Sequence, residues 1–533
     1  MDLFHPCIEK NSAYKLRKEM PGFLFCSESL ATFMNAQKKS LTLNILMNAI
    51  LTMSQFLFPL LTFPYISRIL LPAGMGKVSF ATSVVSYFAL FAQLGIPTYG
   101  IRACARVRDD KEALTRTVQE LFLINLVMSV LAYVALFGAI LFVPRLHQEK
   151  ELFLVVGLTI LFNAIGMEWL YKALEQYTYI TVRSILFKLI AILAMFLLVH
   201  EQSDYMIYGG VSILASSASN VFNFIHLYHY ISLKPVGHYN FRQHFKAVFI
   251  FFAMSCATTI YTNLDTVMLG FLTSDAEVGY YNAAVKIKSI LVSVVTSLGV
   301  VLLPRASYYV ECKLMDKFCR ITHVALNFVI LISVPLTVYF ILFAKEGIFF
   351  LSGAEYEASI VPMQIIMPTL IFIGMTNIMG IQMLIPLGKE RVVLYSEIAG
   401  AVADLLLNVA LIPSMASAGA AIGTVVAEGV VFAVQFWALR KEVLSAYQKV
   451  RYGTIVLALA IASCLWVKTT ALGSFASLLV SAILFFAVYG GVLLFRKEPL
   501  AWQMAEKVSQ MIFKKKENWV ACHVPDEISS ANK

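Results

Sequence analysis

Hydrophobic residues occur along this chain in long runs that short polar connections separate. Fourteen runs are long enough to cross a bilayer, because a helix needs about 20 apolar residues to traverse roughly 30 Å of hydrocarbon. Lipid offers no hydrogen-bond partners, so we expect each span to be a helix. The predicted spans are 43–66, 78–100, 118–143, 151–171, 180–199, 205–230, 247–271, 284–304, 322–343, 361–386, 392–412, 417–439, 453–469 and 475–495.

Composition agrees with this pattern. Hydrophobic residues make up 59% of the 533 residues and charged residues only 14%. No soluble fold hides so much apolar surface. The expected fold class is an all-α integral membrane protein with 14 transmembrane helices.

The basic residues predict an orientation. Lys and Arg gather in the connections 101–117, 231–246 and 305–320, whereas 200–204 and 414–416 contain none. Short basic loops stay in the cytoplasm. An even number of spans then places both termini in the cytoplasm, and topology accounts for the net charge of +10 without a nucleic-acid partner.

The termini and cysteines add little chemistry. Residues 1–33 have neither the basic start nor the apolar core of a signal peptide, so we expect the biological start at Met34. The tail 499–516 is either an amphipathic surface helix or an unstructured basic segment. The eight cysteines form no C-x-x-C pair, so neither a metal site nor a disulfide framework nor any cofactor is expected.

Weak internal similarity predicts two parallel halves. At an offset of 203 residues Gly76 aligns with Gly279, and Arg102 with Arg305; an offset of 212 aligns Ser184 with Ser396. Such repeats, with a site between them near mid-membrane, are typical of transporters. The expected units are a cytoplasmic segment 1–42, an N-lobe 43–246, a C-lobe 247–440, an added helix pair 441–498 and a cytoplasmic basic tail 499–533.

Several ionisable residues lie inside predicted spans, where charge is costly and usually functional. Lys188 lies midway along its span, and Arg183 lies nearer the cytoplasmic end. These cations, with Arg68 at the outer end of the first span, could bind an anionic head group. Each could instead be an interfacial charge or a partner in an internal ion pair.

Carboxylates occupy four further positions within spans. Glu397 and Asp404 are seven residues apart and share a helix face. The short turn after 412 places Asp404 and Glu428 at comparable depth, and Asp265 lies in the outer third of its own span. These groups could titrate or bind a cation to couple transport, or they could hold helices together through hydrogen bonds.

No sequence motif for catalysis is found. Gly74–Val78 lacks the first Gly and the Ser/Thr of a phosphate-binding loop, since Leu71 and Val78 occupy those positions. The connections are too short to hold a catalytic domain. We therefore expect a non-enzymatic protein, driven by an ion gradient or by the gradient of its own substrate.

Several segments together resemble one known family. Residues 40–440 resemble the lipid-linked oligosaccharide flippases of the polysaccharide transport (Wzx-like) group, within the superfamily that also holds MATE drug exporters and lipid II flippases. The segments that carry the resemblance include Phe63–Leu70, Gly76–Ala81, Tyr99–Arg102, Glu168–Tyr171, Ile180–Ser184, Asn263–Gly270, Glu277–Ile287 and Gly419–Thr424.

The resemblance implies a V-shaped protein that moves an undecaprenyl-pyrophosphate-linked oligosaccharide outward across a bacterial inner membrane. Under this hypothesis Lys188, Arg183 and Lys286 contact the pyrophosphate, while Asp404 and Glu428 couple an ion. The implied partners are the lipid-linked saccharide, membrane lipids and a polysaccharide polymerase or assembly protein. The alternatives are a MATE-type drug and cation antiporter, an integral-membrane polymerase or acyltransferase, and a membrane scaffold.

Overall fold

The computed structural model describes residues 27–503, except residue 233 and the segments 448–451 and 465–473, together with residues 505, 506 and 510. Every regular element within these residues is a helix. The start at Met34 is an expectation that the structure does not test, and the predicted tail helix 499–516 lies mostly outside the described residues.

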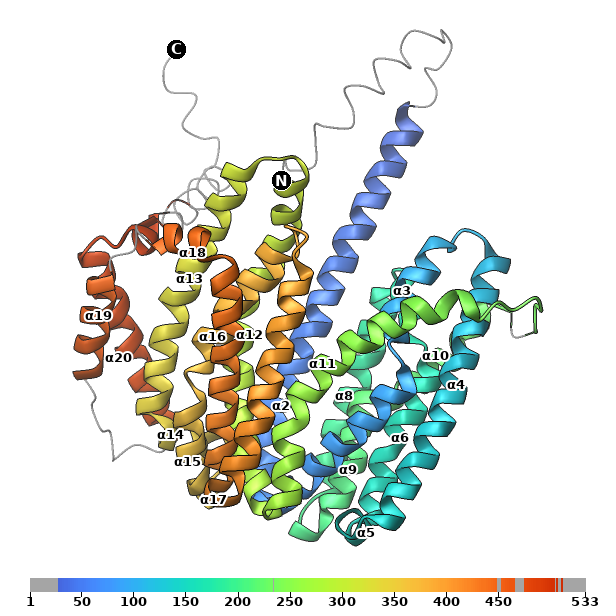
Figure 1. Cartoon of the computed structure of the whole chain (residues 1–533), viewed down its shortest axis with the longest axis horizontal. Helices are drawn as coiled ribbons and strands as arrows, with labels where there is room; N and C mark the ends of the chain where they lie inside the picture. The colour runs from blue at the N-terminus through green and yellow to red at the C-terminus, as the bar shows by residue number, and fades with distance from the viewer. Residues whose placement is uncertain are drawn as a thin grey trace, which may run out of the picture.

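The first helices form one group, the N-terminal helix group, on one side of the molecule (Figure 1). The group comprises α2 (Ser27–Gln93), α3 (Ile96–Arg106), α4 (Lys111–Phe142), α5 (Pro144–Gln148), α6 (Lys150–Gly166), α7 (Glu168–Ala173), α8 (Tyr177–Leu198), α9 (Tyr205–Ile213) and α10 (Asn220–His226).

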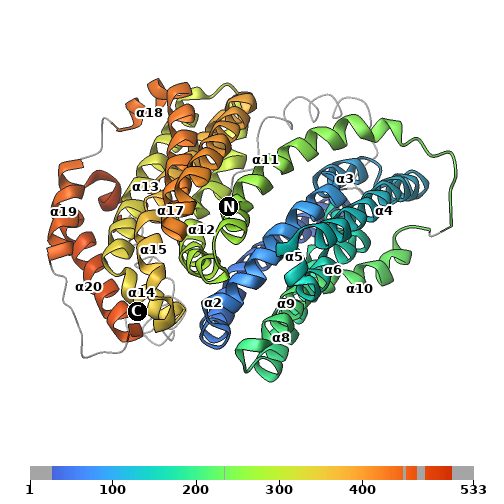
Figure 2. The ribbon, with the colours of Figure 1, turned by 60° about the horizontal axis from the view of Figure 1, so that its bottom comes forward.

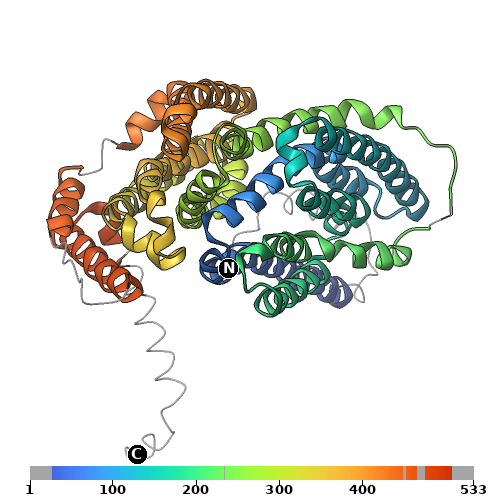
Figure 3. The ribbon, with the colours of Figure 1, turned by 90° about the horizontal axis from the view of Figure 1, so that it is seen from below.

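Later helices gather on the other side as the C-terminal helix group, and Figure 3 shows the two groups side by side. This group comprises α12 (Asp275–Glu311), α13 (Met315–Leu342), α14 (Ala344–Leu351), α15 (Ile360–Ile366), α16 (Thr369–Thr376), α17 (Glu390–Ala438) and α18 (Arg440–Tyr447). The helices α19 (Tyr452–Cys464) and α20 (Ser474–Phe495) pack together at its outer edge, against α13 and α14.

A single helix, α11 (Arg242–Leu272), reaches from one group to the other (Figure 2). Its first turn is fixed to α4, because the buried Glu120 carboxylate accepts from the backbone N–H of Asn240 at 2.6 Å and lies 2.7 Å from His244 Nε2. The other ring nitrogen of His244 lies 2.9 Å from the Tyr99 hydroxyl. These contacts anchor the connection between the groups to the N-terminal side.

The number of separate spanning helices is smaller than the number of predicted spans. Within the described residues, seven helices are long and apolar enough to cross a membrane, or nine when two bent pairs each count as one span. Two pairs of predicted spans lie largely in single helices, α2 and α17, with breaks at Leu71 (φ 57°) and Ala416 (φ 47°). The last residues of the predicted span 78–100 belong to α3, after a further break at Gly95 (φ 74°). Spans 205–230 and 361–386 are divided by the π-helical turns η2 (Leu214–Ala218) and η5 (Asn377–Leu384).

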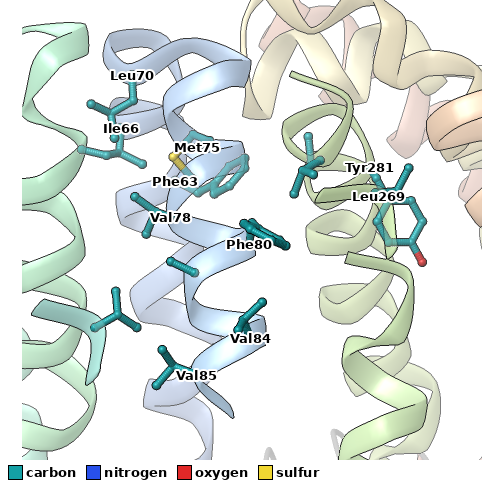
Figure 4. Close-up of a cluster of buried hydrophobic side chains, with 14 of the residues drawn as sticks. Phe63, Ile66, Leu70, Met75, Val78, Phe80, Val84, Val85, Leu269 and Tyr281 are labelled. Atoms are coloured by element: carbon teal, nitrogen blue, oxygen red, sulfur yellow. The ribbon is translucent and has the colours of Figure 1, made fainter. Parts of the chain in front are cut away.

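The two groups touch most closely where α2 packs along α12. A Cβ added to Gly76 would lie 1.7 Å from the Asp275 carbonyl oxygen, and one added to Gly279 would lie 2.0 Å from that of Pro72. Nearby, Phe80 of α2 points toward α11 and α12 in a buried apolar cluster that includes Leu269 and Tyr281 (Figure 4). The two glycines therefore permit a backbone contact that no larger residue allows.

Polar links join the groups at the same end of the molecule, here called the Leu71 end, which contains Leu71, Arg145, Asp275 and Leu351. Arg145 pairs with Asp275 and donates to the Gly270 carbonyl at 3.0 Å. Ser67 donates to the Leu351 carbonyl at 3.3 Å. These links hold α2 and α5 of the N-terminal helix group to α11, α12 and α14.

Candidate functional site

A cavity of about 430 Å³ lies among α2, α8, α9 and α12, and we call it the charged cavity. Glu168, Lys188 and Lys286 line it. Lys188 donates to Ser54 Oγ at 2.7 Å. Neither lysine has an ion-pair partner within the described residues, and Lys286 also borders a smaller cavity beside Gln55. Two predicted cations therefore share one cavity and are available to an anion.

Arg183 occupies a different environment from the two lysines. Its side chain is buried, and the guanidinium contacts Glu168 Oε2, Asn220 Oδ1 and the Ser219 carbonyl, each at 3.3 Å. Glu168 also pairs with Lys172 at 2.8 Å. Arg183 thus fixes the carboxylate that lines the cavity. Both terminal nitrogens of its guanidinium have protein partners, whereas its buried Nε has none among the described residues.

Arg68 lies at the Leu71 end and not in the charged cavity. Its guanidinium donates to the carbonyl oxygens of Phe349 at 3.1 Å and Phe350 at 2.7 Å, and also to that of Pro64. The first two carbonyls end α14, where a cation complements the helix dipole. Arg68 therefore adds a third polar link between the two helix groups.

The carboxylate predicted on α11 lies at the centre of a buried polar cluster. Asp265 Oδ1 accepts from Asn408 Nδ2 at 2.6 Å, and Oδ2 accepts from Thr424 Oγ1 at 2.8 Å and from the Tyr281 hydroxyl. All of these side chains are buried. Asp404 belongs to the same cluster, since its carboxyl faces that of Asp265.

Two oxygen atoms in this cluster have no donor. Asp404 Oδ1 and Asn408 Oδ1 are buried, and no hydrogen-bond donor of the described residues reaches either atom. Both point at Gly423, where an added Cβ would lie 3.1 Å and 2.5 Å from them. A buried acceptor without a partner is costly, and two carboxyl groups in contact cannot both stay ionised without compensation. The cluster therefore suits a proton or a monovalent cation.

Glu397 and Glu428 line a neighbouring cavity of about 270 Å³. Tyr261 of α11 lies beside Glu428 in its wall. The other polar residues that line this cavity are Thr258, Thr262, Thr376, Asn377 and Gln435. The structure therefore brings the four predicted carboxylates into adjacent places between α11 and α17. Asp265 and Asp404 lie in the buried cluster, and Glu397 and Glu428 line the neighbouring cavity.

Sequence analysis did not single out Lys288. It lies near enough for its positive charge to act on both Asp404 and Glu428. Lys286 and Lys288 are two residues apart on α12, which separates their side chains by about 200° around the helix. Lys286 therefore lines the charged cavity, and Lys288 lies on the side of α12 that faces the carboxylates. This spacing is visible in the sequence, but only the packing of α12 gives it meaning.

Two family models match the chain. A model described as "Polysaccharide biosynthesis protein" matches residues 41–310, and the MatE model matches residues 251–410. No group of three or more His, Cys, Asp or Glu side chains placed to hold a metal occurs among the described residues.

Curated relatives and a solved structure agree with these matches. The "Putative O-antigen transporter" of Escherichia coli (strain K12) is 25% identical over 77% of this chain and 99% of its own length. The protein of the same name from Shigella dysenteriae is 23% identical over 68% of this chain and 91% of its own.

The solved structure "Lipid II flippase MurJ, inward closed conformation" has a TM-score of 0.66 at 16% identity, over 85% of this chain and 99% of its own. That similarity establishes the fold, an all-helical membrane architecture. Because the polysaccharide model covers residues 41–310, about half of the sequence, the chain belongs to the polysaccharide biosynthesis protein family, as a multi-pass, non-enzymatic transporter of the Wzx-like flippase type.

Proposed function

We propose that this protein moves an undecaprenyl-pyrophosphate-linked oligosaccharide, the repeat unit of a polysaccharide, across the bacterial cytoplasmic membrane by alternating access. The observation that carries the proposal is that Lys188 and Lys286 share one cavity and have no ion-pair partner among the described residues. A pyrophosphate cannot enter hydrocarbon without replacement of its hydration. Two ammonium groups supply that replacement, while the lipid tail stays in the bilayer.

We further propose that an ion gradient drives the cycle through the carboxylate cluster. The support is chemical, since no donor from the described part of the chain reaches Asp404 Oδ1 or Asn408 Oδ1, which lie beside the Asp265 carboxyl. A proton or a monovalent cation satisfies these oxygens. Glu428 and Glu397 line the adjoining cavity through which the ion would reach them.

The proposed architecture is the 14-span, two-lobe arrangement, with 43–246 and 247–440 as repeated lobes, 441–498 as an added pair, and both termini in the cytoplasm. On this topology the Leu71 end faces outward. Arg145–Asp275, Arg68 and Ser67 would then close the outer side in this conformation. Breaking these few polar links would let the lobes open outward.

Proteoliposomes that contain a labelled undecaprenyl-pyrophosphate oligosaccharide test the proposal. The expected result is transfer of label to the opposite leaflet, faster under a proton or sodium gradient, and slowed by Lys188→Met. Full transfer by a Lys188→Met, Lys286→Met double variant would contradict the role of the charged cavity.

A MATE-type cation antiporter is the second candidate. The observation in its favour is the acidic cavity with Glu397, Glu428 and Tyr261, which lies in helices that the MatE model partly covers. Export of a cationic dye by the same proteoliposomes, without transfer of the saccharide lipid, would favour this function.

A further inference from the structure

A second cavity, of about 400 Å³, lies where α2, α6 and α11 meet, and we call it the neutral chamber. It shares no lining residue with the charged cavity. Residues of the second arm of α2, beyond Leu71, and residues of α11 line it. The helix α11 crosses between the helix groups (Figure 2). The chamber is therefore a separate space at the junction of the groups.

The chemistry of this chamber differs from that of the charged cavity. Eight of its fourteen lining residues carry a hydroxyl or amide side chain, and none of these described lining residues carries a charge. The polar residues that α2, α6 and α11 contribute include Gln93, Thr159, Asn163, Ser255, Thr259 and Asn263. Such groups both donate and accept hydrogen bonds, as sugar hydroxyl and acetamido groups do.

Several of these side chains are available to a ligand. Within the part of the chain that the structure describes, the side chains of Gln93, Thr159 and Ser255 make no hydrogen bond to protein. By contrast, Thr82 and Ser86 in the same wall donate to carbonyls of their own helix, at 2.8 Å and 2.7 Å. The unpartnered groups come from three different helices, so together they surround the space.

A hydrogen-bonded wall joins the neutral chamber to the charged cavity. Asn163, which lines the chamber, accepts from Asn220 Nδ2 at 3.4 Å. Asn220 Oδ1 accepts from Arg183 at 3.3 Å, and Arg183 contacts Glu168, which lines the charged cavity. Arg183 and Asn220 thus connect the walls of both spaces. Asn163, at one end of this hydrogen-bonded chain, lines the neutral chamber, and Glu168, at the other end, lines the charged cavity.

We propose that the neutral chamber binds the sugar residues beyond the first one, as neutral hydroxyl and acetamido groups, while the charged cavity holds the pyrophosphate. This inference rests on the proposed function. It also sets a preference, because a carboxylate-bearing sugar would lose hydration in a chamber whose described lining residues include no cation to compensate its charge.

The test compares two substrates in proteoliposomes of the full chain, undecaprenyl-pyrophosphate monosaccharide and the matching neutral tetrasaccharide. The double variant Gln93→Ala, Thr159→Val removes two side chains without protein partners. It is expected to slow transfer of the tetrasaccharide by roughly tenfold, because two hydrogen bonds to the sugar are lost, and to leave transfer of the monosaccharide within about twofold of wild type. Thr322→Val, in α13 and outside each cavity described above, is the matched control.

The outcomes separate the two proposals. Equal slowing of both substrates, or of neither, would overturn the neutral chamber while leaving the charged cavity intact. Lys188→Met is expected to slow both substrates alike. If the wild-type protein moves neither substrate, the proposed function fails, and the chamber's role fails with it. A tetrasaccharide with one uronic acid in place of a neutral sugar is expected to move more slowly, and equal rates would contradict the neutral preference.

Discussion

The acceptors without donors in the carboxylate cluster make Asp404 the most informative residue to change. Asparagine keeps the size of Asp404 and can donate to Asp265, but it cannot release a proton at this site. We expect Asp404→Asn to fold normally and to reduce the stimulation of transfer by an ion gradient at least tenfold, since hydrogen bonds to charged groups contribute about 1.5–3 kcal/mol. Transfer rates with and without a gradient measure this effect.

The matched control is Asp316→Asn, an exposed carboxylate at the start of α13. It should leave the gradient response unchanged. Wild-type stimulation in Asp404→Asn would remove the cluster from ion coupling.

Lys188 offers a second residue-level prediction. Its ammonium contacts only the Ser54 hydroxyl among the described side chains, so Lys188→Met removes a charge that a pyrophosphate would meet. We expect binding of a lipid pyrophosphate to weaken roughly 10–100-fold, which corresponds to the loss of about 1.5–3 kcal/mol. Equilibrium binding of undecaprenyl pyrophosphate in nanodiscs measures it. Lys172→Met, at a lysine paired with Glu168, should weaken binding much less; equal losses would argue for a general charge effect.

The sequence predicted which ionisable residues matter better than it predicted the hydrogen-bond and ion-pair partners of each. Asp265 and Asp404 stand out because ionisable residues in a span are rare, and the structure brings them together. The contacts of Arg183 with Ser219 and Asn220 depend on the π-helical turn η2, which lies inside the sixth predicted span and directly precedes these two residues. No hydropathy pattern encodes that turn.

At the level of elements, the close contact of α2 and α12 depends on two glycines. The added methyl group of Gly76→Ala would collide with backbone, because the Asp275 carbonyl cannot rotate away as a side chain could. We expect the free energy of unfolding to fall by about 1–3 kcal/mol, which is typical of overpacking. A lower midpoint of thermal unfolding in detergent measures this loss. Gly138→Ala in α4, where nothing lies within 4 Å, should be neutral or stabilising. Unchanged stability in Gly76→Ala would mean that the helices can separate freely there.

Hydropathy located the apolar segments and also their breaks, because Leu71 and Ala416 lie in the predicted connections 67–77 and 413–416. It did not predict that each break would centre on a non-glycine residue with positive φ. The offset of 203 residues aligned Gly76 with Gly279 as equivalent positions of the two predicted halves. Both glycines lie at the contact between the helix groups. The repeat itself stays a prediction.

For the whole molecule, the decisive question is what holds the Leu71 end closed. Arg145 and Asp275 come from different helix groups, and their side chains are 25% and 17% exposed. Lys77 and Glu149 form an equally buried pair, at 26% and 18% exposure, but within the N-terminal helix group. Breaking the first pair should favour opening between the groups, and breaking the second should not.

The substitution Ser184→Cys, in the wall of the charged cavity, reports this opening. It is made in a variant from which all native cysteines have been removed, and the variant is expressed in cells. We expect Arg145→Ala to raise its labelling by a membrane-impermeant maleimide from outside about tenfold, since 1.4 kcal/mol changes an equilibrium tenfold. The exchange Arg145→Asp with Asp275→Arg should restore low labelling, because the pair forms again with reversed charges. Lys77→Ala should leave labelling at the wild-type level. Equal labelling in Arg145→Ala and Lys77→Ala would mean that apolar packing around Phe80 and the two glycines closes this end without the ion pair.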